Sequence, residues 1–176
     1  MIRLIFVHAS DIQLLEDAAI EQILEWQPQI VLAAGPPLYL TGVLTRQQCQ
    51  QSLDNALRLA RQVDTLILDH HLLRSLEGFD WLSLLSEQAG KRIYCAADFM
   101  RKPRLPLEAL RFELYRELPT PAGWYEAYAQ GQAEPEEFCD ETLLAKLGSQ
   151  SQRSVNQDPR IVFPELIRYV EMPELQ

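Results

Sequence analysis

The chain has 176 residues, 47% of them hydrophobic and 23% charged, which is typical of a folded globular domain rather than of a disordered or fibrous chain. Its formal net charge of -9 argues against a general affinity for nucleic acid or for anionic lipid surfaces. The longest apolar run is too short to span a bilayer, and the start lacks a signal-peptide pattern, so we expect a cytoplasmic protein without membrane or nucleic-acid partners.

Strand-like and helix-like segments alternate over the first 118 residues. Short runs of branched and aromatic residues predict four strands, at Arg3–Val7, Ile30–Ala34, Thr65–Leu68 and Arg92–Ala96. Apolar residues spaced three and four apart predict helices at Asp17–Trp26, after an N-cap at Thr45, near Trp81–Ala89 with Gly90 as the stop, and at Arg111–Leu118. This alternation is typical of an α/β sheet with helical crossovers.

The remaining residues have a different character and lack strand signals. They comprise a short aromatic helix candidate at Trp124–Gln130, an acidic stretch at Glu134–Asp140, a Ser/Gln-rich linker at Gly148–Asp158 and an amphipathic end at Val162–Val170. We therefore divide the chain into an α/β part, residues 1–118, and a helical extension with a flexible tail, residues 119–176.

All the histidines lie at the ends of predicted strands. His8 precedes Asp11 after the first strand, while His70 and His71 follow Asp69 after the third. Ligand sites of parallel sheets open at the carboxyl ends of strands, and imidazole with carboxylate suits zinc, manganese or iron. Asp11 and one of His70 or His71 are candidate metal ligands, with Asp69 and His8 as outer partners that orient an imidazole. Zinc normally takes at least three protein ligands, and the sequence offers no further histidine and no thiolate pair.

Two further segments allow more than one interpretation. The turn Gly35-Pro36-Pro37 is either a rigid strand exit or part of a pocket in which Tyr39 donates a hydrogen bond. The basic run Arg101–Arg104 is either a solvated loop or an anion contact. No phosphate-binding glycine loop and no Gly-x-Ser-x-Gly elbow is present.

Three segments, taken in order, resemble the second half of a branch of the metallo-beta-lactamase-fold hydrolases: His8–Gln13, Gly35–Leu40 and Leu68–Arg74. The resemblance covers roughly residues 1–118. It implies half of an αββα sandwich, with a site for one or two divalent metal ions between the two halves. It also implies that Asp11 is the bridging carboxylate and that His70 or His71 is the last histidine ligand, His71 being favoured by its distance from the strand. In the complete form a metal-bound hydroxide would attack an ester or phosphoester bond.

The sequence also departs from that family. The His-x-His-x-Asp-His motif of the first half has no counterpart, and Leu14-Leu15 stands where the branch has Gly-Pro. We therefore expect a partial relative of a metal-dependent hydrolase that is inactive as this chain alone. Half a sandwich exposes an apolar sheet face. We expect that face to be covered by the C-terminal tail, by a second copy of the chain or by a separately encoded N-terminal half.

Two rival functions come from other classes. A strand that runs into Asp69-His70-His71 also resembles the third motif of manganese phosphoesterases named for those residues, although their Asp-x-Asp motif is missing. The second rival is a non-catalytic interaction module that uses the acidic, aromatic segment Trp124–Phe138 as its contact surface.

Overall fold

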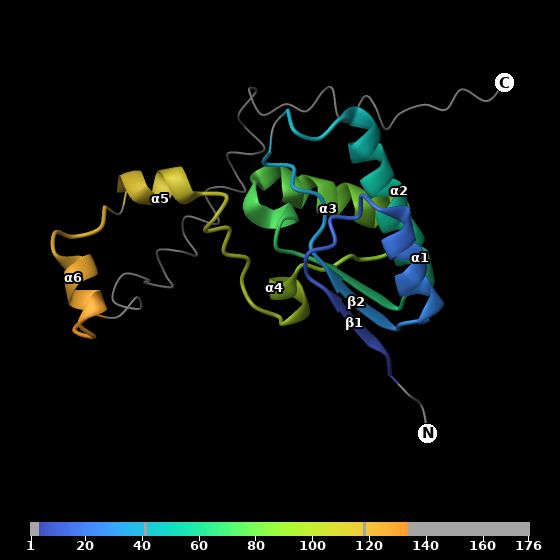
Figure 1. Ribbon diagram of the computed structural model, residues 1–176, viewed down its shortest axis with the longest axis horizontal. Coiled ribbons are helices and arrows are strands. Elements are labelled where there is room, and N and C mark those ends of the chain that lie inside the picture. Colours follow the sequence, from blue (N-terminus) through green and yellow to red (C-terminus); the bar gives the residue numbers. More distant parts are fainter. Residues whose placement is uncertain (1–3, 41, 118, 134–176) are drawn as a thin grey trace.

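The computed structural model describes residues 4–40, 42–117 and 119–133 (Figure 1). Three short strands, β1 (Phe6–Ala9), β2 (Ile30–Ala33) and β3 (Thr65–Leu68), form a parallel sheet in the order β1-β2-β3. The helices are α1 (Asp17–Glu25), α2 (Arg46–Gln62), the 3-10 turn η1 (Leu72–Arg74), α3 (Leu76–Ala89), α4 (Ala96–Phe99), α5 (Arg111–Glu117) and α6 (Trp124–Ala129). The α/β class predicted from the sequence is therefore confirmed.

The sequential order of the strands explains why the helices gather on one side of the sheet, as Figure 1 shows for α1, α2 and α3. Parallel strands are almost always joined by right-handed crossovers, and a sheet built in one direction then receives every crossover helix on the same face. That face carries the core. Val7, Val31 and Leu66 pack there with apolar residues of the three helices.

The opposite face of the sheet is only partly covered. Phe6 pairs in register with Ile30, and His8 with Leu32. The Phe6 side chain is 53% exposed and His8 is also exposed, while Ile30 and Leu32 are half-buried. Parallel sheets normally bury both faces, so this partial exposure is unusual. We call the surface formed by these four residues the open face.

The predicted strand boundaries need two corrections. The fourth strand, Arg92–Ala96, does not form: Tyr94 makes a single parallel bridge to Ile67, and the chain then turns at Cys95 into α4, which the sequence did not predict. The first strand runs over Phe6–Ala9, two residues beyond the predicted end at Val7, and the predicted start at Arg3 lies outside the described residues.

The helices follow the sequence more closely. Thr45 caps α2 in a capping box with Gln48, as the N-cap prediction required, and Gly90 ends α3 with a φ of 64°. Helix α3 starts at Leu76 rather than near Trp81. The predicted acidic stretch, linker and amphipathic end from residue 134 onward lie outside the described residues. None of the described helices combines the length and the hydropathy that crossing a bilayer requires.

Candidate metal centre

Asp11 lies in the loop between β1 and α1, and helix α2 holds this loop in place. The buried Asn55 of α2 donates from Nδ2 to the carbonyl oxygen of Leu14 (3.0 Å) and to Oδ1 of Asp17 (2.9 Å). Leu14 is fully buried in the left-handed region, with a φ of 63°. The backbone that follows Asp11 is thus fixed at Leu14, whereas the Asp11 side chain itself is 87% exposed.

The two histidines follow β3 in a tight turn that is held by the Asp69 carboxylate. Oδ1 of Asp69 accepts from the backbone N–H of His70 (2.7 Å), and Oδ2 accepts from that of Ala96 (2.6 Å). His70 has a φ of 55°, a left-handed conformation that costs a non-glycine residue about 1–2 kcal/mol. This turn projects both imidazoles from the carboxyl end of β3.

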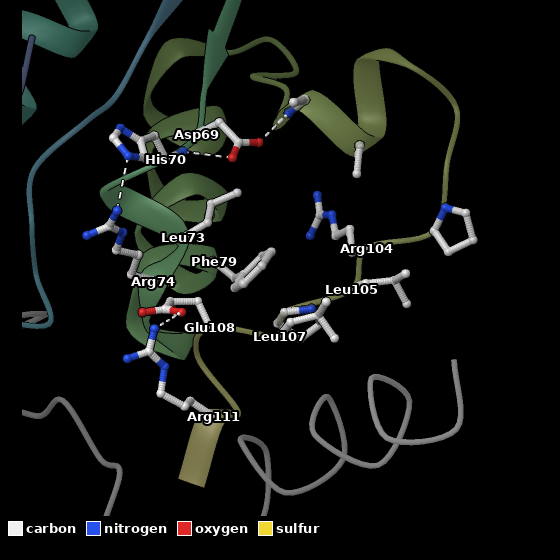
Figure 2. A pocket seen from close by; sticks show the side chains of 14 residues that line it. Asp69, His70, Leu73, Arg74, Phe79, Arg104, Leu105, Leu107, Glu108 and Arg111 are labelled. Carbon is white, nitrogen blue, oxygen red and sulfur yellow. Dashed lines mark hydrogen bonds and ion pairs between the residues drawn. The ribbon is translucent and has the colours of Figure 1, made fainter. Parts of the chain in front are cut away.

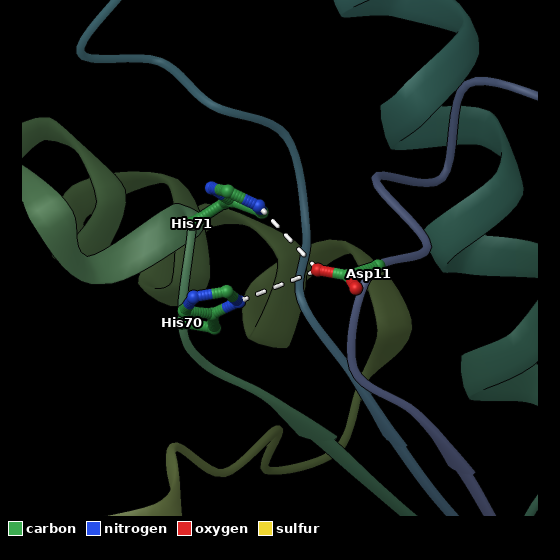
Figure 3. A group of neighbouring side chains, drawn as sticks. All are labelled: Asp11, His70 and His71. Carbon is green, nitrogen blue, oxygen red and sulfur yellow. Dashed lines mark ion pairs between the residues drawn. The ribbon is translucent and has the colours of Figure 1, made fainter.

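The structure brings Asp11, His70 and His71 together, as Figure 3 shows. One potential ligand atom of each residue lies within 4.8 Å of the others. Oδ1 of Asp11 is 4.0 Å from Nδ1 of His70 and 3.8 Å from Nε2 of His71. Two segments about 60 residues apart in sequence therefore meet at the carboxyl edge of the sheet, as the sequence predicted.

Tyr39 and Arg74 connect the two imidazoles on the side away from Asp11. The Tyr39 hydroxyl hydrogen-bonds Nδ1 of His71 (3.2 Å), and Nη1 of Arg74 donates to the same hydroxyl (3.3 Å). Nη2 of Arg74 donates to Nε2 of His70 (3.1 Å). Asp11, Tyr39, His70, His71 and Arg74 thus form a closed ring of neighbours, which we call the site network.

The Arg74 contact makes the two histidines unequal as ligands. A guanidinium only donates, so Nε2 of His70 must accept, and a neutral His70 then carries its proton on Nδ1, the atom nearest Asp11. That Nδ1–H faces the carbonyl oxygen of Ser10 at 3.4 Å. Tyr39 can either donate to or accept from His71, so Nε2 of His71 can present a lone pair to a cation.

The environment of His71 also favours its neutral form. Burial lowers the pKa of His71, and the neighbouring His70 and Arg74 lower it further, while Asp11 opposes the shift. A metal ion competes with protons for an imidazole, so a group that is already neutral binds a cation with less pH dependence.

The other predicted site residues have different positions. His8 lies within β1 on the open face and stacks on Phe6 with 6.5 Å between ring centroids. In the described part of the chain, the hydrogen bonds and ion pairs of the His70 and His71 rings do not include His8, so the expected orienting contact is absent. Asp69 positions the backbone rather than an imidazole. Tyr39 takes the role expected of an outer partner.

A cleft of about 770 Å³ adjoins the site network (Figure 2). It lies between the start of α3 and the segment that follows α4, and Asp69, His70 and Arg74 line one edge. Tyr39, the pocket residue predicted from the sequence, is not among its lining residues. Arg74 was not among the predicted site residues. Helical spacing does not indicate its contact with His70, because His70 has a left-handed conformation and lies before η1.

Comparison with known proteins places the chain beside longer archaeal proteins. It is 50% identical over 135 residues to a UPF0282 protein of Methanosarcina mazei, a match that covers 76% of this chain and 44% of the relative. A UPF0282 protein of Thermococcus sibiricus is 36% identical over 127 residues, which cover 68% of this chain and 40% of the relative. A UPF0282 protein of Methanopyrus kandleri is 39% identical over 112 residues, which cover 62% of this chain and 38% of the relative. The chain thus spans less than half the length of these relatives. No protein-family model and no solved structure matches it.

Proposed function

We propose that Asp11, His71 and His70 belong to a divalent-metal site of a hydrolase, with zinc as the first candidate and manganese or iron as alternatives. The observation that carries the proposal is the convergence of one carboxylate and two imidazoles within 4.8 Å at the carboxyl edge of a parallel sheet. Two imidazoles and one carboxylate form a donor set that catalytic zinc and non-haem iron sites use.

The distances fit a site that tightens when an ion binds. Bonds of about 2.0–2.2 Å in tetrahedral geometry place neighbouring ligand atoms about 3.3 Å apart. The distances from Asp11 Oδ1 to His71 and to His70, 3.8 and 4.0 Å, exceed this value by about 0.5 and about 0.7 Å. The exposed Asp11 side chain can make that movement without disturbing the core.

We take His71 as the principal imidazole ligand. Its Nε2 faces Asp11 and its Nδ1 bonds the Tyr39 hydroxyl, which is the arrangement that orients metal-bound imidazoles in proteins. Ligation through Nδ1 of His70 would instead move a proton onto Nε2, where it would face the Arg74 donor. His70 is therefore the weaker ligand or a proton carrier next to the ion.

A bound divalent ion would acidify a water molecule and polarise an ester-type bond. In such a site Asp11 would orient the attacking water, while Tyr39 and Arg74 would hold the imidazoles in place. We further propose the half-sandwich architecture of the metallo-beta-lactamase fold, because one sheet with helices on a single face is what half of an αββα sandwich would contain.

The open face supports the second part of this proposal, a partner that completes the site. Its occupant, we propose, is polypeptide equivalent to the part of the longer relatives that this chain does not span, and that layer would supply the missing ligands. The same face favours the second candidate function, an interaction module without catalysis. Light scattering after size-exclusion chromatography tests the partner: a stable monomer in which Phe6→Ser changes neither solubility nor melting temperature would contradict a docking role.

The metal proposal is tested by calorimetric titration of the purified chain with zinc and with manganese. We expect weak binding that Asp11→Ala abolishes and that His71→Gln reduces at least tenfold more than His70→Gln. His8→Gln is the matched control, because it removes an imidazole from the same sheet without touching the site network. If neither ion binds, or if the three site variants bind like the wild type and like His8→Gln, the proposal is refuted.

A further inference from the structure

The cleft beside the site network has the size and position of a substrate site. Its volume of about 770 Å³ lies within the range that ligand pockets occupy. His70 and Arg74 belong both to the cleft lining and to the site network, as seen at one edge of the cleft in Figure 2. A molecule in this cleft would therefore lie next to the proposed metal ion.

Three arginines line the cleft, and two of them already contact carboxylates. Arg104 donates two hydrogen bonds to Asp98, at 2.9 and 2.6 Å, and Arg111 donates to Glu108 at 2.6 Å. Arg74 instead donates to a phenol and an imidazole, and no ion pair of the described residues includes it. Of the three arginines that line the cleft, Arg74 is thus the one whose charge is not balanced by a contacting carboxylate among the described residues.

The Asp69 carboxylate also lines the cleft but does not neutralise Arg74. Both of its oxygens accept backbone N–H groups, those of His70 and Ala96. These two hydrogen bonds, dashed in Figure 2, hold the carboxylate against the backbone at His70 and Ala96. The guanidinium of Arg74 therefore keeps N–H donors for a ligand after its bonds to Tyr39 and His70.

Part of the cleft wall is apolar, beside the charged residues that also line it. Leu73 and Phe79 lie on the η1 and α3 side, and Leu105 and Leu107 come from the segment opposite (Figure 2). Leu105 and Leu107 are 38% and 42% exposed, so part of their apolar surface is open to solvent. Such walls suit an apolar substituent rather than a free inorganic ion.

We propose that the cleft binds an organic phosphate ester, with Arg74 holding the phosphoryl oxygens beside the metal ion and the apolar walls holding the ester substituent. This inference rests on the proposed function. A guanidinium binds phosphoryl oxygens through paired, charge-assisted hydrogen bonds. A divalent ion together with Arg74 leaves positive charge that Asp11 alone does not balance, and a dianionic phosphoryl group neutralises it more fully than a carboxylate does.

The test measures, by calorimetry, the affinity of the zinc-loaded chain for phenyl phosphate. Benzoate, a carboxylate, and phenol, which has no anionic group at neutral pH, are the comparison ligands. We expect phenyl phosphate to bind at least tenfold more tightly than benzoate, and phenol to bind most weakly. Arg74→Gln should weaken phenyl phosphate at least tenfold. Arg111→Gln is the matched control: it removes the same charge from the same cleft, and we expect less than a threefold change. Thermal melts establish that both variants are folded.

Zinc affinity, measured without phosphate, separates the two proposals. Zinc binding that depends on Asp11, combined with equal phenyl phosphate binding by wild type and Arg74→Gln, overturns the inference and leaves the metal proposal standing. Benzoate binding as tight as phenyl phosphate also overturns it, even if a variant fails to fold. If the chain binds no metal, the proposed function fails and this inference fails with it.

Discussion

Replacing Asn55 with alanine would test how the Asp11 loop is held. Asn55 is 1% exposed, and its amide donates to the carbonyl oxygen of Leu14, itself fully buried. In Asn55→Ala that carbonyl loses its donor, and an unsatisfied buried acceptor costs about 1–3 kcal/mol. The other two partners, the exposed Asp17 and the partly exposed Arg58, can turn to water, so they add little. We expect a loss of about 2 kcal/mol in the free energy of unfolding.

Urea unfolding followed by circular dichroism measures this loss. We expect a lower midpoint at an unchanged m-value, and a melting temperature lower by about 4–8 °C. Gln50→Ala is the control on the same helix: its side chain makes one exposed hydrogen bond to Asp54 at 3.0 Å, worth about 0.5 kcal/mol or less. If Asn55→Ala were as stable as Gln50→Ala, the Leu14 bond would not be what holds the loop.

Two other features give predictions about stability. Arg104 donates two hydrogen bonds to Asp98 and thereby lowers the pKa of that carboxyl, so the pair stabilises the fold above about pH 4 and loses its effect as the pH falls through the lowered value. In urea titrations, Asp98→Asn should be less stable than the wild type at neutral pH, and the difference should shrink in acid; a constant difference would contradict the ion pair. A Cβ on Gly78 would lie 1.7 Å from the carbonyl oxygen of Leu72, so Gly78→Ala should cost about 3 kcal/mol or more. Gly90→Ala, with a φ of 64° and no atom within 4 Å, should cost only about 1 kcal/mol, and equal melting temperatures of the two variants would refute the close approach at Gly78.

The convergence of Asp11 with the two histidines could be predicted because it follows from topology. Parallel strands end at the same edge of the sheet, so residues just beyond β1 and β3 must be close. His8 illustrates the limit of that reasoning. It lies inside β1, where side chains alternate between faces, and a strand that runs to Ala9 instead of Val7 places it on the open face.

The contacts of Tyr39 and Arg74 could not be predicted in the same way. They depend on how the turn after β2 packs against η1, a non-local arrangement with no periodic signal in the sequence. The missing fourth strand has a similar origin. The segment around Tyr94 has the composition of a strand, but the bond from Ala96 to Asp69 and the cap at Cys95 direct the chain into α4 after one bridge.

The sequential strand order also has a consequence for how the chain folds. Pairing Phe6 with Ile30 and then Ile30 with Thr65 joins residues about 24 and about 35 positions apart, so each step closes a short loop at modest entropic cost. We therefore expect nucleation at β1, α1 and β2, followed by addition of α2 and β3, an order that matches synthesis from the N-terminus. The core between the sheet and its helices could thus form stepwise while the chain is still being synthesised.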